Sequence, residues 1–229
     1  MSMPRSDGAM SGRKIELNYQ GHDLVLYGEK ALYIKDRETL VMADLHLGKA
    51  RSFRARNFFA PDGVCAHDLA RLQFLIETTG ARRLMILGDM VHAADGLQLP
   101  VVEAFAGFRE RYAALDAMLV LGNHDKRVSI PDSWRLDIVE GVHHENGLVF
   151  VHEHEAEHAD MPGLKLSGHL HPAVRLIGGK RSERVACFWF SGRSIVLPSF
   201  GSFTGSYVIQ PSRDDRVFAI ADGIITALL

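Results

Sequence analysis

Short apolar runs separated by charged or glycine-containing breaks dominate the first half of the chain. Three runs within residues 24–43 predict a hairpin and a returning strand, and runs at 84–87 and 118–121 predict two further buried strands. Apolar residues recur at three- and four-residue intervals within residues 64–79 and again from Val101 to Tyr112, which predicts two amphipathic helices. Strands that alternate with helices in this way are typical of a parallel sheet with right-handed crossovers.

The pattern changes after about residue 134 to short strands with Gly and Ser turns and little helix. The apolar runs lie at 148–151, 164–166, 186–190, 195–197, 207–209 and 217–220. A mostly antiparallel second half would supply another sheet to pack on the first. We therefore predict an α/β fold with two mixed β-sheets packed as a sandwich and flanked by helices, in one domain over residues 13–229. Residues 1–12 are polar and unpatterned, which predicts a flexible N-terminal tail.

Composition and charge narrow the class of protein. The 229 residues are 47% hydrophobic and 24% charged, as in an ordinary globular protein. The formal net charge of −2 argues against a protein that coats nucleic acid through overall basicity. Basic residues do gather locally, because residues 45–61 contain Lys49, Arg51, Arg54 and Arg56 and no acidic residue.

Cysteine usage and hydropathy indicate the compartment. Cys65 and Cys187 are far apart and form no C-x-x-C pair, so we expect buried apolar side chains and neither a disulfide framework nor a cysteine zinc site. No apolar run reaches about 18 residues, and no hydrophobic leader opens the chain. We therefore expect neither membrane spanning nor secretion, and we predict a cytoplasmic protein.

Polar side chains follow five of the predicted strands at the point where each strand ends. They are Asp44, His46, Asp89, Asn123, His124, Asp125, His152, His169 and His171. A single polar residue at a strand end is more often a loop residue whose hydrogen bonds are satisfied locally. Chance does not explain polar, metal-ligating residues at five strand ends in this order. Imidazoles, carboxylates and an amide without thiolates suit manganese, iron or zinc. Nine groups exceed the needs of one ion, whereas two ions sharing a carboxylate fit the count and are a standard device for phosphodiester hydrolysis.

The order of these motifs carries a family resemblance. The series Asp44-x-His46, Gly88-Asp89, Gly122-Asn123-His124-Asp125, His152 and Gly168-His169-x-His171 resembles the signature of the calcineurin-like metallophosphoesterases. The chain also resembles a narrower family, the bacterial ligase-associated DNA-damage-response phosphoesterases, in segments 43–49, 88–92, 167–172, 187–189 and 197–205. The resemblance implies the αββα metallophosphoesterase fold.

The resemblance also implies a role for each motif residue. One metal would be held by Asp44, His46 and His171, the other by Asn123, His152 and His169, and Asp89 would bridge both. The cofactors would be two divalent ions, manganese first, with iron or zinc as alternatives. His124 would stay off the metals and face the leaving group, with Asp125 orienting its ring. Glu153, where the family usually has glycine, departs from the pattern and adds negative charge.

The resulting hypothesis is a metal-dependent phosphoesterase that hydrolyses phosphodiester bonds, in DNA ends or single-stranded nucleic acid during repair, with DNA ligase or helicase partners implied by the resemblance. Two alternatives stay open: a small-molecule phosphatase or cyclic-nucleotide phosphodiesterase, and a non-catalytic scaffold that binds a repair partner. The sequence sets no oligomeric state.

Several residues near the motifs have two interpretations. The basic run Lys49, Arg51, Arg54 and Arg56 either holds phosphates that flank the scissile bond or forms a solvated loop. His92 either lines the pocket or caps the next segment. Phe58 and Phe59 are expected to pack in the core, with base stacking as the alternative. A solvated loop is expected for the histidine-rich set His143, His144, His154 and His158.

Overall fold

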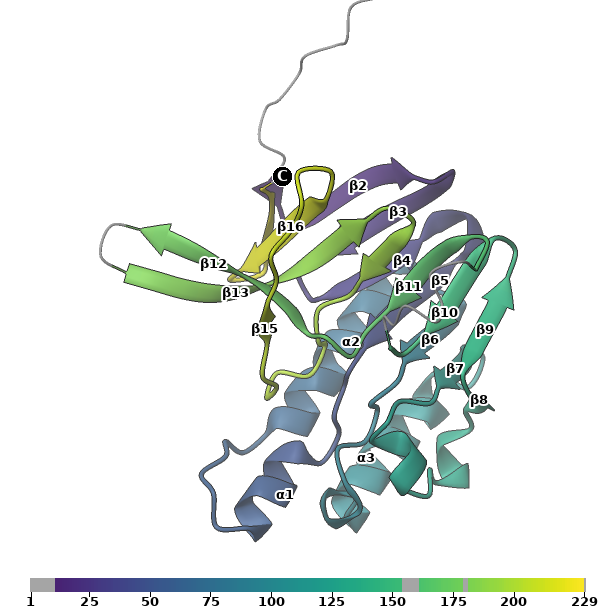
Figure 1. Cartoon of the computed structure of the whole chain (residues 1–229). Coiled ribbons are helices and arrows are strands. Elements are labelled where there is room, and N and C mark those ends of the chain that lie inside the picture. Colours follow the sequence, from purple (N-terminus) through teal and green to yellow (C-terminus); the bar gives the residue numbers. More distant parts are fainter. Residues whose placement is uncertain (1–10, 154–160, 179–180, 229) are drawn as a thin grey trace, which may run out of the picture.

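The computed structural model describes residues 11–153, 161–178 and 181–228, and two β-sheets form its centre (Figure 1). The first sheet has the strand order β2-β3-β4-β5-β6-β7-β8. Its strands are β2 (Lys14–Tyr19), β3 (His22–Tyr27), β4 (Ala31–Ile34), β5 (Thr39–Ala43), β6 (Arg83–Leu87), β7 (Asp116–Val120) and β8 (Asp137–Val139). Strands β2 to β5 pair antiparallel and β5 to β8 pair parallel, so the sheet is mixed as predicted.

The second sheet is built mainly from the second half of the chain. Its order is β1-β17-β16-β13-β14-β11-β10-β9, and β12 pairs with β13 and β15. The strands are β1 (Ser11–Gly12), β9 (Val142–Glu145), β10 (Leu148–Val151), β11 (Leu164–Ser167), β12 (Pro172–Gly178), β13 (Arg181–Ser191), β14 (Ser194–Val196), β15 (Tyr207–Val208), β16 (Arg216–Ala221) and β17 (Ile224–Ala227). Because β10, β11 and β14 pair parallel while most other pairs are antiparallel, this sheet is also mixed.

The two faces of the first sheet pack on different partners. Three α-helices leave this sheet: α1 (Lys49–Ala55), α2 (Val64–Thr79) and α3 (Leu99–Arg111). On β5, Leu40 and Met42 belong to an apolar cluster shared with α2 and α3, whereas Val41 belongs to a second cluster shared with β13 and β16 of the other sheet. Alternate residues of a strand point to opposite faces, so β5 lies between a helix layer and a sheet layer. The predicted sandwich is confirmed.

The predicted helices also agree with the structure. Helix α2 covers the predicted residues and buries Leu72, Leu75 and Ile76. It ends at Gly80, whose φ of 65° is left-handed and whose N–H donates to the Ile76 carbonyl at 2.9 Å. Short 3-10 turns complete the helical elements: Lys35–Arg37, Ala94–Gly96, Asp125–Arg127 and Asp132–Trp134.

Elements with a weak apolar signal were missed by the sequence patterns. They are β2, β8, β9, β12, β17 and α1. Strand β2 buries Ile15 alone, and β12 leaves the second half of its length exposed, so neither strand has a long apolar run. Helix α1 is seven residues long and buries Ala50 and Ser52, which is too little to produce an amphipathic stripe.

Other sequence expectations need correction. Ser11 and Gly12 pair with β17, so two residues of the predicted tail belong to a strand, while residues 1–10 lie outside the described residues. Core packing is wrong for Phe58 and Phe59, which are 62% and 93% exposed. Cys187 is buried as expected, but Cys65 is half-buried.

The remaining expectations concern the histidine-rich set and the membrane. His143 and His144 lie in β9, where the His143 ring is 3.1 Å from Glu145, and His154 and His158 lie outside the described residues. None of the described helices has the length and hydropathy that a membrane span requires.

The packing of α3 gives a test of this core. Phe105 of α3 is fully buried, and its ring centroid lies 4.8 Å from that of Trp134. We expect Phe105→Ala to lower the free energy of unfolding by about 3–5 kcal/mol, because it removes apolar contacts and leaves a cavity. Phe59→Ala, which truncates an exposed ring, serves as the control and should change stability by less than about 0.5 kcal/mol. Urea denaturation of both variants measures this, and equal effects would contradict the described packing.

Candidate metal centre

The predicted motif residues lie at the carboxyl ends of strands from both sheets. Asp44 and His46 follow β5, Asp89 follows β6, and His152 follows β10. His169 and His171 both follow β11. The two sheets are tied together at this edge, because Ala43 forms a parallel bridge with Ser199. Side chains from strands that are far apart in sequence therefore converge at one place.

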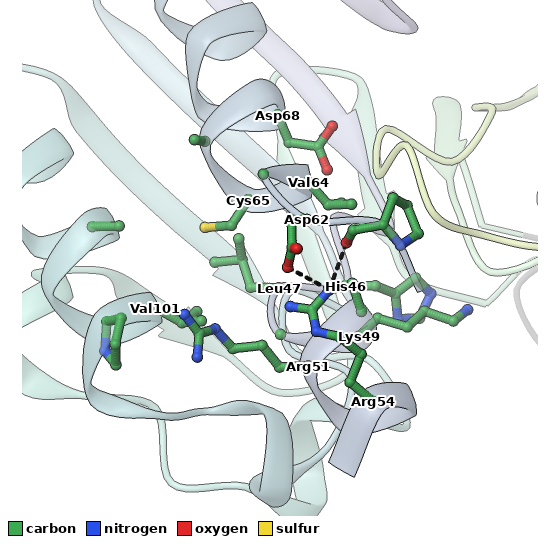
Figure 2. Close-up of a pocket in the computed structure, with 17 residues that line it drawn as sticks. His46, Leu47, Lys49, Arg51, Arg54, Asp62, Val64, Cys65, Asp68 and Val101 are labelled. Atoms are coloured by element: carbon green, nitrogen blue, oxygen red, sulfur yellow. Dashed lines mark hydrogen bonds and ion pairs between the residues drawn. The ribbon is translucent and has the colours of Figure 1, made fainter. Parts of the chain in front are cut away.

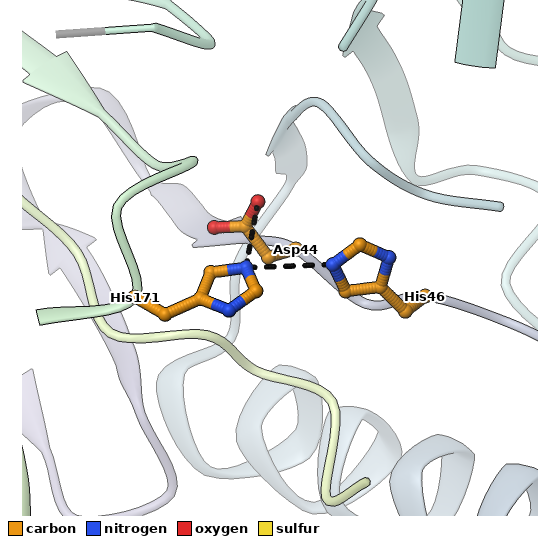
Figure 3. A group of neighbouring side chains, drawn as sticks. All are labelled: Asp44, His46 and His171. Atoms are coloured by element: carbon orange, nitrogen blue, oxygen red, sulfur yellow. Dashed lines mark hydrogen bonds and ion pairs between the residues drawn. The ribbon is translucent and has the colours of Figure 1, made fainter. Parts of the chain in front are cut away.

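Asp44, His46 and His171 form a first group whose ligand atoms all lie within 4.8 Å of one another. Figure 3 shows both imidazole rings directed toward each other and His171 directed at the carboxylate. The Nε2 atoms of His46 and His171 are 3.4 Å apart, and His171 Nε2 is 3.4 Å from Asp44 Oδ1. Asp44 is fully buried and His46 nearly so. Three donor atoms thus face one point in a water-poor site.

Asp89, His152 and His169 form the second group. His152 Nε2 lies 3.4 Å from Asp89 Oδ1, 3.1 Å from His169 Nδ1 and 3.2 Å from Asn123 Oδ1. The second oxygen of Asp89, Oδ2, is 3.8 Å from His46 Nε2 in the first group. One carboxylate therefore borders both groups, as expected of a bridging ligand.

The burial of His46 and the hydrogen bonds of His152 and His171 suit metal binding. Burial lowers the pKa of His46 to about 2, so its imidazole is neutral. His152 Nδ1 is 3.0 Å from the Leu87 carbonyl, and His171 Nδ1 is 3.0 Å from the Gly205 carbonyl. Donation of Nδ1–H to these carbonyls leaves the Nε2 lone pairs directed into the groups, an arrangement typical of metal-ligating histidines. The two groups therefore fit two divalent ions that accept nitrogen and oxygen ligands.

The backbone at the ligands is strained. Five of the seven ligand candidates have a left-handed φ between 48° and 66°: Asp44, His46, Asp89, His169 and His171. Each such residue costs roughly 1–3 kcal/mol, and such residues cluster at functional sites. The neighbouring glycines permit the close approach, because a Cβ on Gly122 would meet the backbone nitrogen and Oδ1 of Asp89 at 2.3 Å.

His124 stands beside the two groups but belongs to neither. Its Nε2 is 3.9 Å from Asp89 Oδ2, and its Nδ1 is 2.7 Å from the backbone carbonyl of His92. The His92 and His124 rings are stacked with centroids 5.0 Å apart. The ring of His124 is thus held by the His92 carbonyl and the His92 ring, with Nε2 directed toward the metal ligands.

Asp125 does not orient His124, which corrects the sequence expectation. The Asp125 carboxylate is buried and accepts the backbone N–H of Val91 at 2.9 Å and of Gly122 at 3.0 Å. Burial raises the pKa of this carboxyl group, and the backbone donors partly oppose that effect. Asp125 therefore joins the loop after β6 to the loop after β7, which carry the ligand candidates Asp89 and Asn123.

Most of the predicted basic run supports the local structure. Arg54 donates to the carbonyls of Ala60 and Pro61 and pairs with Asp62 at 3.1 Å, and Figure 2 shows its guanidinium directed at Asp62. Arg51 donates to Gln98 at 3.1 Å, and Arg56 pairs with Asp95 at 2.8 Å. These arginines fasten helix α1 and the following loop to their neighbours.

Lys49 differs from the three arginines. It is the first residue of α1, three positions after His46, and within the described part of the chain no hydrogen bond or ion pair engages its ammonium group. Burial lowers the pKa of Lys49, while the charges of Asp89 and Asp44 oppose the shift. Lys49 also lines one hollow together with His46 of the first group. His92 lines a hollow of about 240 Å³ together with Arg56, His124 and Arg127, so it faces a pocket.

Two contributors received no role in the site from the sequence, although segment 197–205 is among those that carry the family resemblance. Arg127 is exposed and lines the same hollow as His124. Its place two residues after the Asn123-His124-Asp125 motif was the available sequence signal. Segment 199–205 makes three hydrogen bonds to the first group. Ser199 Oγ and the Gly201 N–H donate to the Asp44 carbonyl, and the Gly205 carbonyl accepts a hydrogen bond from His171 Nδ1. Only the folded chain brings this segment to the ligands.

The fold and the two ligand groups are consistent with a calcineurin-like metallophosphoesterase and support a metal-dependent phosphoesterase. The chain is similar to the nuclease MPE of Pseudomonas putida, whose crystal structure superposes with a TM-score of 0.82 at 28% identity over 94% of this chain and 100% of that one.

More distant solved structures also match. The phosphoesterase Yfce of E. coli gives a TM-score of 0.40 at 15% identity, over 80% of this chain and 88% of that one. A conserved protein of Streptococcus pneumoniae, described as a predicted phosphoesterase, gives 0.30 at 14% identity, over 80% and 83%. No protein-family model and no curated protein matches the chain.

The contacts of Asp125 lead to a prediction. We expect Asp125→Ala to weaken divalent metal binding by roughly 10- to 100-fold, because it releases the Val91 and Gly122 N–H groups that align two ligand loops. Calorimetric titration of the metal-free protein with Mn²⁺ measures this change. A side chain that acted only by orienting His124 would leave metal affinity unchanged when truncated.

Proposed function

We propose that the chain is a dinuclear-metal-dependent phosphodiesterase that acts on DNA ends or single-stranded nucleic acid during repair. The observation that carries the proposal is the pair of ligand groups bordered by one carboxylate, Asp89, with His124 held outside both. The similarity to a protein named as a nuclease supports a nucleic-acid substrate. The proposal includes a ligase or helicase partner, which rests on the family resemblance, and a cytoplasmic location, which rests on the cysteine usage and hydropathy of the sequence.

The proposed ligand set follows the two groups. Asp44, His46 and His171 hold one ion, and His152, His169 and Asn123 hold the other, with Asp89 between them. Manganese is the proposed metal, with iron or zinc as alternatives of similar ligand preference. When bound, such a pair of cations lowers the pKa of water and stabilises negative charge on phosphoryl oxygens.

The residues of the chain position the metal ligands, bind the ester and transfer a proton. The strained loops hold the ligand atoms in place, and Lys49 attracts and orients the anionic ester from the edge of the site. His124, fixed through Nδ1 by the His92 carbonyl, keeps Nε2 free to hold or give a proton. In the proposed reaction the doubly protonated ring of His124 gives the Nε2 proton to the departing alkoxide oxygen and becomes neutral.

Two substitutions separate metal binding from proton transfer. We expect Asp89→Asn to lose bound metal together with activity, because it removes charge from the carboxylate that borders both groups. We expect His124→Ala to keep two ions per chain but to lose roughly 100- to 10,000-fold in turnover, the usual share of general acid–base catalysis. Elemental analysis and steady-state kinetics on an aryl phosphodiester measure the two quantities.

These outcomes are checked against a substitution away from the site. Glu103→Gln, on an exposed position of α3, should bind metal and turn over substrate as the unmodified protein does. Full activity in Asp89→Asn, or loss of metal in His124→Ala, would contradict the assigned roles.

A substrate panel tests the nucleic-acid assignment. We expect the manganese-loaded protein to cleave single-stranded or nicked DNA and an aryl phosphodiester in preference to phosphomonoesters. DNA binding should weaken steeply as salt concentration rises, because phosphate contacts release counterions. Preferred hydrolysis of a small monoester or a cyclic nucleotide, with no salt-sensitive DNA binding, would instead support a metabolite-directed enzyme.

A further inference from the structure

A row of aromatic rings leads from His124 to the protein surface. His92 stacks on His124, and the Phe53 ring lies 6.0 Å from His92. Phe53 in turn meets Phe203 edge-to-face at 5.4 Å and Phe58 at 6.0 Å. The row joins helix α1 to segment 199–205, two parts of the chain separated by about 150 positions. It starts beside the metal groups and ends at an exposed ring, since Phe58 is 62% exposed.

Core packing does not account for these rings. Among the described residues, none of Phe53, Phe58 and Phe203 belongs to any of the three apolar clusters of the core. Phe53 and Phe203 are each part-buried, so a face or an edge of each ring remains open to solvent. Aromatic surface left open next to a catalytic group is suited to bind part of a substrate.

A hollow of about 270 Å³ lies along this row. Its lining consists of Lys49, Phe53, Ser202, Phe203, Thr204 and Gly205. The size is slightly below the roughly 300 Å³ at which drug-sized pockets begin, which suits a group as large as one nucleobase. The hollow also adjoins the first metal group, because the Gly205 carbonyl is bonded to His171. The hollow therefore borders the site at which an ester would be held.

The lining offers aromatic rings that suit the base of a nucleotide and a cation that suits its phosphate. The rings of Phe53 and Phe203 offer apolar faces and edges, while the Lys49 ammonium offers a positive charge without a competing partner among the described residues. Serine and threonine hydroxyls at positions 202 and 204 offer polar contacts at the rim. A base stacks on aromatic rings, and a phosphate pairs with a cation.

We propose that this hollow is a base-binding subsite in which Phe203 and Phe53 stack on the base of a nucleotide adjoining the scissile phosphate, while Lys49 contacts the phosphate. The subsite rests on the proposed function, since it assigns a place to one part of a nucleic-acid substrate. Stacking of one base changes binding by roughly 5- to 150-fold in other single-strand-binding proteins. The subsite thereby selects nucleotide esters over simple diesters.

A double-mutant cycle between protein and substrate tests the subsite. The substrates are a thymidine dinucleotide, which has a single cleavable phosphodiester, and two analogues in which one or the other base is removed. For Phe203→Ala we expect kcat/KM on the intact dinucleotide to fall roughly 5- to 150-fold. On the analogue that lacks the stacked base, the unmodified protein should already be slow, and the substitution should change the rate less than twofold.

Matched variants separate stacking from loss of structure. Phe203→Tyr, which keeps the ring, should retain most of the rate on the intact dinucleotide. Phe74→Ala removes a half-exposed ring from α2 outside the hollow and should change neither substrate. Metal content and melting temperature are measured for every variant, so that a folding defect is recognised.

The outcomes are distinguishable. Equal effects of Phe203→Ala on the intact dinucleotide and on both analogues would overturn the base-binding subsite while leaving the phosphodiesterase assignment standing. Cleavage of an aryl diester with no cleavage of any dinucleotide would overturn the subsite and the nucleic-acid substrate together. Absence of all phosphodiester hydrolysis in the metal-loaded protein would overturn the proposed function itself.

Discussion

The close approach of donor atoms from both sheets is the constraint on which the rest of the structure depends. Imidazole nitrogens only 3.1–3.4 Å apart and a buried carboxylate beside them gather several polar atoms at one water-poor place. Burying polar groups this close together costs free energy, so the fold has to hold them in place. The apolar clusters on the two faces of β5 make the sheet rigid enough to do so. The positive φ angles at five of the ligand candidates add backbone strain to the free energy of the folded chain.

The same constraint explains where sequence reasoning succeeded. Helix α2 and the buried strands follow from apolar periodicity, because burial on a sheet imposes that periodicity. The ligand candidates follow from their place behind those strands, since carboxyl ends of parallel strands share an edge. The edge strand β2 and the seven-residue α1 carry little buried apolar surface, so they leave no comparable signal.

The roles of individual polar residues were harder to predict. The family resemblance implied that Asp125 orients His124, yet its buried carboxylate accepts hydrogen bonds from the backbone of two loops instead. Arg54 and Arg56 appeared as free cations in the sequence, but Asp62 and Asp95 neutralise them after folding. Local sequence patterns do not predict a contact with a residue of another loop. They do show which residue types can bind a metal.

Segment 199–205 has a consequence for the energetics of the whole site. It bonds to Asp44 and His171 on one side and carries Phe203 on the other, so one short piece of backbone serves both the ligands and the hollow. If metal and nucleotide bind as proposed, a base that displaces Phe203 shifts the ligand candidates, and a cation held by those candidates shifts the lining of the hollow. Thermodynamic reciprocity then requires that metal and nucleotide change each other's affinity by the same factor.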